Sequence, residues 1–294
     1  MVRYRNLQAA IPYVLPGALL VFVFIYLPVV MSFAFSLYRW SAFSVKKVYV
    51  GFAYYHRLLS DPIFYTALQN NGLYAVISIV CQVGLGLVLA AILEEKLFRK
   101  HQPFFRTVYF VPSVISFTVI GLLWQMLYNP DIGIVNAALR GVGLEVLALG
   151  WLGDSRVAIY AVIAVSQWQY TGYIMMLFLV AIQKIPPELY EAAMIDGANR
   201  VQSFFHVTVP QVKAMIVVNM AITVIGAFKV FDEIYIMTGG GPGRSTEVLA
   251  TYLYRSAFRN DEMGFANAIG CVIFLLTFAL SVLQLRLSRV GRVE

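Results

Sequence analysis

Charged residues are scarce in this chain of 294 residues. Asp, Glu, Lys and Arg together make up 13% of it, against about 25% in soluble domains. Hydrophobic residues reach 60%, and the excess falls in runs of about 18 or more residues with almost no charge, which are typical of transmembrane helices. These proportions exclude a soluble globular protein and predict an all-α, polytopic membrane protein.

Cysteine and histidine are also rare. The two cysteines, Cys81 and Cys271, lie inside apolar runs, which indicates small core residues rather than a disulfide or a metal site. His56, His101 and His206 lie outside the runs, without the H-E-x-x-H spacing of a metalloprotease. No base lies beside a serine at membrane depth either, so we expect no metal site and no catalytic residue.

Six apolar runs predict six transmembrane helices in a single domain covering residues 1–294. Each run can cross about 30 Å of hydrocarbon at about 1.5 Å per residue. The first is too long for a signal-peptide core of about 7–15 residues, so we expect it to be retained. The runs cover residues 11–37, 70–93, 107–128, 157–182, 212–235 and 264–286.

The net charge of +7 reflects membrane topology rather than a nucleic-acid partner, because the basic residues flank the runs. An even number of spans places both termini on one side. Basic residues are denser in the segments on that side, which predicts that both termini are cytoplasmic. These segments contain Arg3, Arg5, Lys96, Arg99, Lys100, Arg106, Lys184, Arg200, Lys213, Arg286, Arg289 and Arg292.

The cytoplasmic loop 186–210 predicts two short helices joined by a tight turn. Pro186 and Pro187 fit a first helical turn, and Gly197 can end the helix in the left-handed conformation. Asn199 and Gln202 have the spacing of a capping box for the second helix. We also expect the two aromatic residues that follow, Phe204 and Phe205, to be buried.

This loop carries Glu188, Glu191 and Asp196 against Arg200. Connectors that rest on lipid headgroups usually carry more Lys and Arg on the polar face. An acidic face suits a basic groove on another protein better, although a connector on the lipid surface stays an open alternative.

The same loop resembles a known motif. Glu191-Ala192-Ala193, then Gly197, then Val207 and Val209-Pro210 at the right spacing resemble the EAA loop of binding-protein-dependent ABC importer permeases. The family usually has Ile and Leu where this chain has the two valines, so the apolar character is kept. The resemblance implies the type I ABC importer permease fold.

A second stretch, FKVFDEIYIMTGGGPGRSTEVLATYLYRSAF (Phe228–Phe258), resembles the end of the fifth span and the next loop of carbohydrate permeases of the maltose and glycerol-3-phosphate type. The chain lacks the extra spans and large outer domain of the large maltose-type members, and so resembles the six-span form. The glycines do not form a P-loop, because Arg244 stands where that motif needs lysine. An outer loop of this kind suits close backbone approach or docking.

The resemblance implies several partners and a bacterial or archaeal cell (inner) membrane. They are a second homologous permease, usually unlike this one, two ABC ATPase subunits and an extracytoplasmic sugar-binding protein. The chain itself would bind no cofactor, since ATP and Mg²⁺ would sit on the ATPases. Glu191 would meet a basic ATPase residue. The residues expected to carry the coupling are Glu188, Glu191, Ala192, Ala193, Asp196, Gly197, Ala198 and Arg200.

Polar residues inside the runs are candidates for the substrate path, because amides and hydroxyls bind sugar hydroxyls and aromatic faces stack on sugars. Four of them share one face of the fourth run. Hydrogen bonding between helices is the alternative role for each. The candidates are Ser166, Gln169, Tyr170, Tyr173, Asn219, Thr223, Ser113 and Phe117.

The expected function is therefore transport of a di- or oligosaccharide, by a subunit that is not itself an enzyme. A shortage of Lys and Arg at mid-run favours a neutral sugar, with glycerol phosphate or another small polar solute as the alternative. Carboxylates are nearly absent from mid-run positions, which disfavours a secondary transporter. The polar fourth run disfavours a purely structural subunit. Two interpretations of Lys229 stay open: pairing with Glu233, or extension of its ammonium to the membrane interface.

Overall fold

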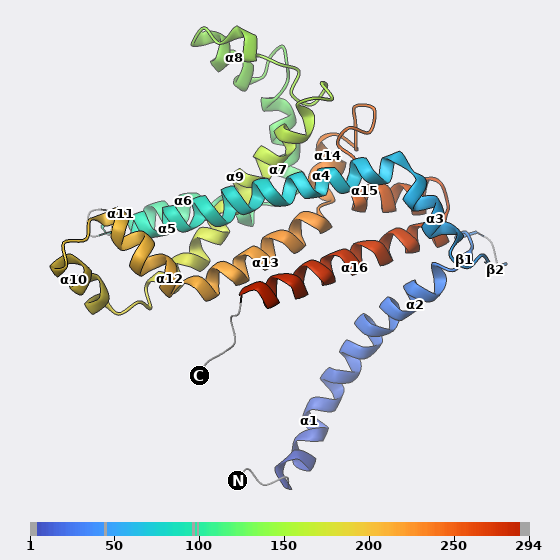
Figure 1. Ribbon diagram of the computed structural model, residues 1–294. Helices are drawn as coiled ribbons and strands as arrows, with labels where there is room; N and C mark the ends of the chain where they lie inside the picture. The colour runs from blue at the N-terminus through green and yellow to red at the C-terminus, as the bar shows by residue number, and fades with distance from the viewer. Residues whose placement is uncertain (1–4, 44–45, 96–97, 99, 289–294) are drawn as a thin grey trace. The chain divides into compact units, whose positions relative to one another are not determined.

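The computed structural model describes residues 5–43, 46–95, 98 and 100–288 (Figure 1). Among the basic residues used to predict the orientation, five lie outside this part: Arg3, Lys96, Arg99, Arg289 and Arg292. The chain divides into two compact units. One comprises Met1–Asp61 and Tyr252–Phe274, and the other comprises Pro62–Thr251 and Leu275–Glu294.

The first unit begins with a long apolar helix and a small hairpin. The helix comprises α1 (Arg5–Val21), the π-helical segment η1 (Phe22–Tyr26) and α2 (Leu27–Phe35). Its residues Pro12–Phe35 are apolar enough to cross a membrane, and none of the side chains in that window is buried. The hairpin pairs β1 (Tyr38–Arg39) with β2 (Val48–Tyr49), and helix α3 (Ala53–Ser60) follows.

Three later elements complete the first unit or continue from it. They are α15 (Leu249–Tyr254), the π-helical segment η5 (Arg255–Arg259) and the long helix α16 (Met263–Ser288). The prediction of a sixth span at 264–286 matches α16, which has 24 residues that meet the length and hydropathy of a span.

The second unit is a bundle of long helices. The second predicted span forms one continuous helix of 33 residues, made of α4 (Pro62–Ser78), η2 (Ile79–Leu85) and α5 (Gly86–Glu94). It starts before residue 70 because Pro62 begins its first turn. Helix α9 (Ala158–Ile182) is the fourth span and packs along α5 and α6 (Gln102–Val114) (Figure 1).

Two predicted spans are broken. The third consists of α6 and α7 (Phe117–Leu127), bent by 97° at Ile115 and Ser116, whose backbone is extended just after the helix-interior Pro112. The fifth begins at α13 (Lys213–Lys229), which ends at an extended Val230 before α14 (Asp232–Met237) begins. By length and composition, the described residues contain three helices able to span a membrane, or up to six spans when each of three bent helix pairs counts as one.

The break after α13 also decides between the two interpretations of Lys229. Lys229 ends α13, whereas Glu233 lies in the first turn of α14, so the two residues do not share a helix face. In the described part of the chain no ion pair joins them. Lys229 is exposed and Glu233 is buried, so of the two interpretations left open, the pairing of Lys229 with Glu233 is wrong.

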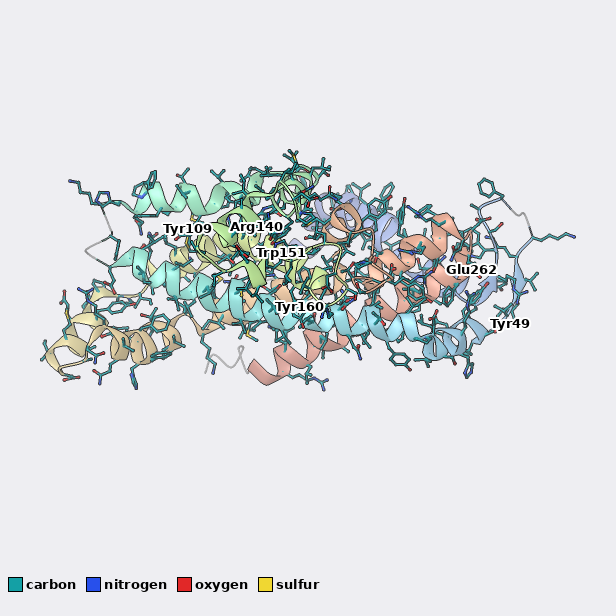
Figure 2. All side chains as sticks on the ribbon, turned by 90° about the horizontal axis from the view of Figure 1, so that it is seen from above. Tyr49, Tyr109, Arg140, Trp151, Tyr160 and Glu262 are labelled. Atoms are coloured by element: carbon teal, nitrogen blue, oxygen red, sulfur yellow. The ribbon has the colours of Figure 1, made fainter. Side chains whose placement is uncertain are left out.

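A loop between the third and fourth spans is held together by polar contacts. It contains α8 (Ile134–Gly141) and the 3-10 turn η3 (Glu145–Leu147). The indole of Trp151 donates a hydrogen bond to Asn136 Oδ1 at 2.8 Å, and the guanidinium of Arg140 donates to the Pro130 carbonyl at 3.0 Å. Figure 2 shows Arg140 and Trp151 in this loop.

Candidate functional site

The loop 186–210 forms the predicted pair of helices, which we call the bracket. Its first helix, α10, spans Pro187–Ile195. Gly197 has a φ of +80°, and the amides of Gly197 and Ala198 donate to the carbonyls of Met194 and Ala193 at 3.1 and 2.9 Å. These are the two hydrogen bonds of a Schellman motif, which confirms the helix end that glycine predicts.

The second helix of the bracket starts with the predicted capping box. Asn199 accepts from the amide of Gln202 at 2.9 Å, and Gln202 accepts from the amide of Asn199 at 2.8 Å. The helix runs as α11 (Arg200–Ser203), the π-helical segment η4 (Phe204–Thr208) and α12 (Val209–Gln211). A hydrogen bond of 2.9 Å between the hydroxyls of Tyr190 and Thr208 ties the two helices together.

The bracket is attached to the bundle through a shared apolar core. Phe204, Val207 and Val209 pack against buried residues of α5 and α9, such as Leu93 and Phe178. The predicted burial of Phe205 is wrong, because its side chain is 60% exposed.

The predicted coupling residues lie on an open surface. Glu188, Glu191, Ala192, Asp196, Gly197 and Arg200 are exposed, and Ala193 and Ala198 are half-buried. Large apolar side chains stand among them, with Ile195 86% and Val201 65% exposed. Exposed apolar groups rimmed by charges are typical of a protein interface.

The predicted substrate residues fall into two groups. Ser166, Gln169, Asn219, Thr223 and Phe117 are buried within the chain. Tyr173 is 40% exposed, and Tyr170 and Ser113 are half-buried. In this structure the exposed face of the fourth span is therefore aromatic rather than amide-bearing.

Gln169 has a defined partner. Its amide donates to the Ile115 carbonyl at 3.0 Å, at the break between α6 and α7. A broken helix leaves carbonyls without partners, and these must be satisfied inside a membrane. Gln169 therefore joins the fourth span to the broken third span, as the alternative of hydrogen bonding between helices predicts.

Three other amide side chains, which the sequence did not single out, also bind backbone groups of other segments. Asn71 donates to the Ala227 carbonyl at 2.6 Å and accepts from the Leu249 amide at 2.9 Å. Asn70 binds the Glu247 carbonyl, and Gln125 binds the last carbonyls of α14. The available signal was amide side chains inside or at the edge of an apolar run.

The glycine-rich stretch forms a compact loop. Gly239, Gly240 and Gly243 have positive φ angles. Thr246 donates to the Gly241 carbonyl at 2.8 Å, and its hydroxyl lies 2.7 Å from that of Thr238. The loop is closed on itself by these bonds, and the left-handed turns explain why glycine is needed there.

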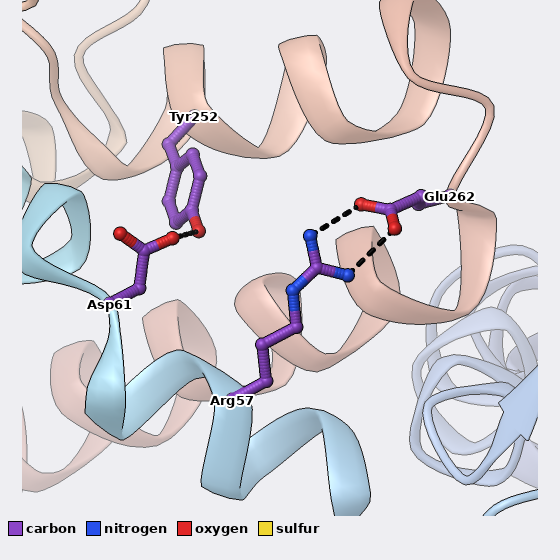
Figure 3. Close-up of polar contacts among 4 residues, drawn as sticks. All are labelled: Arg57, Asp61, Tyr252 and Glu262. Atoms are coloured by element: carbon purple, nitrogen blue, oxygen red, sulfur yellow. Dashed lines mark hydrogen bonds and ion pairs between the residues drawn. The ribbon is translucent and has the colours of Figure 1, made fainter.

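A group of polar side chains, which we call the clasp, joins α3 to the start of α16 (Figure 3). Arg57 binds both oxygens of Glu262 at 2.7 and 2.9 Å, and its guanidinium lies 4.2 Å from the centroid of the Phe265 ring. The hydrogen bonds that Arg57 donates to the Glu262 carboxylate raise the pKa of Arg57. Tyr252 donates to Asp61 at 2.5 Å.

The described residues contain no cluster of His, Cys, Asp and Glu that could hold a metal ion. The bracket, the buried amides and the exposed tyrosines instead suit movement of a solute through a helical bundle, with an exposed element available to a protein partner.

Comparison with known proteins gives consistent matches. A family model described as "Binding-protein-dependent transport system inner membrane component" matches residues 82–290. The chain is 54% identical to "Probable ABC transporter permease protein YurN" of Bacillus subtilis (strain 168), covering 98% of this chain and 99% of the relative. It is 35% identical to "Arabinooligosaccharides transport system permease protein AraP" of Halalkalibacterium halodurans, covering 97% and 90%.

A solved structure has the same fold. It is a bacterial ABC transporter involved in the import of the acidic polysaccharide alginate, with a TM-score of 0.84 over 98% of this chain and 99% of the matched one. At 22% identity this likeness concerns the fold alone.

Proposed function

Because this chain belongs to the family of binding-protein-dependent transport system inner membrane components, we propose that it is the membrane-spanning permease subunit of an ATP-driven importer of a di- or oligosaccharide. The bracket carries the proposal, because an exposed, acid-bearing helix pair with a Schellman turn at Gly197 suits docking into a basic groove. The name of the arabinooligosaccharide relative supports a carbohydrate substrate.

In this proposal the chain works within an assembly. A second, unlike permease completes the solute path. Two ABC ATPase subunits bind ATP and Mg²⁺ below the membrane, and an extracytoplasmic binding protein delivers the sugar. Both termini then face the cytoplasm of a bacterial or archaeal cell.

The bracket transmits movement by a mechanical route. Closure of the ATPase pair displaces Glu188, Glu191, Asp196 and their neighbours as one body, because the bonds of Gly197 and Tyr190 make the bracket rigid. The apolar core between the bracket, α5 and α9 passes that displacement into the spans.

The proposed solute path runs along the face of α9 that carries Tyr170 and Tyr173, together with Ser113, whereas Ser166 of the same predicted set is buried. Tyr173 is the strongest candidate for stacking on a sugar ring, since its side chain is exposed. The buried members Gln169, Asn219, Thr223 and Phe117 support this face from behind.

Cysteine crosslinking in the assembled importer tests the proposal. Cysteine at Ala192, on the open side of the bracket, should crosslink to the ATPase subunit. The control is cysteine at Val146, 90% exposed in the loop between the third and fourth spans, which should not. Capture at Val146 and not at Ala192 would overturn both the docking role and the orientation.

The substrate class is tested with the assembled importer in nanodiscs. Its ATPase activity should rise when the binding protein is loaded with a neutral sugar from a panel of arabino-oligosaccharides, maltose and lactose. Stimulation by glycerol phosphate alone would replace the sugar with that solute. No stimulation of any ATPase, with solute uptake driven by an ion gradient, would make the chain a secondary transporter.

A further inference from the structure

Two adjacent carboxylates at the end of α5 bind three other segments of the second unit. Glu94 Oε1 accepts hydrogen bonds from the amides of Gln102 and Gln183, each at 2.6 Å. Glu95 Oε2 accepts from Arg200 Nη1, also at 2.6 Å. The end of the second span is thereby joined to the start of α6, to the end of α9 and to the bracket.

Both members of the ion pair stand at the unfavourable end of their own helices. Glu95 is the C-cap of α5, where the helix dipole is negative and no basic residue lies in the last turn. Arg200 is the first residue of α11, where the dipole is positive. Each charge opposes its own helix and is neutralised by the other, so the two helix ends favour each other.

Apolar contacts alone would not fix this arrangement. The core between the bracket and α5 is non-directional, and such a surface permits small sliding movements. The ion pair adds a directed contact on the outer side of that core, between the second helix of the bracket and the second span.

We propose that Glu95 is a positioning residue for coupling, holding the bracket to the second span through Arg200. This inference rests on the proposed function. Displacement of the bracket by the ATPase then moves the second span together with the fourth and fifth. Glu94 likewise holds α6 and α9 to the C-terminal end of α5.

Distance measurement between two spin labels tests the proposal without any sugar. The labels are placed at Ile92, exposed on α5, and at Ala198 in the bracket. The measurement uses the assembled complex, and Cys81 and Cys271 of this chain are replaced by serine. The distribution of distances between the labels should be narrow, and its maximum should not move when ATP and vanadate trap the closed ATPase pair. This result means that the bracket and the second span move together.

Charge reversal should release the bracket. In Glu95→Arg and in Arg200→Glu the distribution of label distances should broaden, and its maximum should shift on trapping. The ratio of molecules with the bracket held to α5 to those with it released should fall about fivefold, as for loss of an exposed ion pair. The double variant with exchanged charges should restore the narrow distance. Lys184→Glu is the control, because Lys184 is exposed nearby and forms no ion pair among the described residues.

The outcomes separate this inference from the proposed function. If the single variants behave like the unchanged protein while cysteine at Ala192 still captures the ATPase, the positioning role is wrong and the permease function stands. If the double variant stays as broad as the single ones, a directed ion pair is not the cause. Failure of the Ala192→Cys crosslink when Glu95 and Arg200 are both intact removes the basis of both.

Discussion

Gly172, in the middle of α9, is the position at which one added methyl group should cost most. A Cβ there would lie within 3.0 Å of the backbone carbonyl of Tyr109 on α6, and 3.2 Å from the Phe110 nitrogen. Both obstacles are backbone atoms of a helix, so no side chain can rotate away. Figure 2 shows Tyr109 on α6.

The cost of Gly172→Ala follows from this contact. Overpacking a well-packed core costs about 1–3 kcal/mol, and we expect the upper end because two helix backbones must separate. About 3 kcal/mol lowers the ratio of folded to unfolded protein by about two orders of magnitude. The loss should appear as a lower midpoint when the purified chain is unfolded by SDS in mixed micelles.

Gly72→Ala is the matched control. Gly72 lies inside α4, and a Cβ there would meet nothing within 4 Å. Alanine in place of glycine in a helix interior stabilises by about 0.5–1 kcal/mol. The reasoning would be refuted if the two variants unfolded at the same SDS fraction, since the close approach of α6 and α9 would then not affect the free energy of unfolding.

Three further perturbations test the bracket, the solute path and the clasp. Gly197→Val should leave the chain inserted but lower sugar uptake per ATP hydrolysed, because a left-handed residue other than glycine costs about 1–2 kcal/mol; normal coupling would contradict this. Gln169→Ala should lower the free energy of unfolding in SDS by about 1–3 kcal/mol, because a helix-break carbonyl loses its donor, whereas Tyr173→Ala should lower uptake at an unchanged SDS midpoint; the reverse pattern would exchange their roles. Arg57→Ala should lower thermal stability more than Arg57→Lys, because lysine keeps a charge beside the carboxylate but not the paired bonds; equal melting temperatures would show that the clasp is dispensable.

Local signals in the sequence were sufficient to predict the bracket. Proline at the first helical turn, glycine at the C-terminal turn and the Asn199–Gln202 spacing all act over a few residues. The physical cause therefore lies within the stretch itself. The same holds for the long spans, where uninterrupted hydrophobicity is enough to predict a helix.

The breaks in the third and fifth spans could not be predicted in this way. Pro112 in the run 107–128 signals a kink, but it does not predict a full break at Ile115, because the partner that satisfies the freed carbonyl is Gln169 in another span. The end of α13 likewise depends on Asn71 of the second span. Hydropathy reports how apolar a run is, and not which distant amide replaces its lost helical bonds.

The predicted substrate set shows the same limit. A helical period gathers Ser166, Gln169, Tyr170 and Tyr173 on one face, but it does not tell which members face neighbouring helices. The structure buries Ser166 and leaves Tyr173 exposed. The burial of Asn219 and Thr223 against neighbouring helices was equally invisible in a single run.

The closeness of α6 and α9 at Gly172 has a consequence for how the protein changes shape. Two helices separated by less than the width of a methyl group interlock, and neither can slide along the other without first moving apart. With Gln169 bound to the break in the third span just beyond this contact, the third and fourth spans form one stiff lever. Any rearrangement of the bundle must then carry α6 and α9 together.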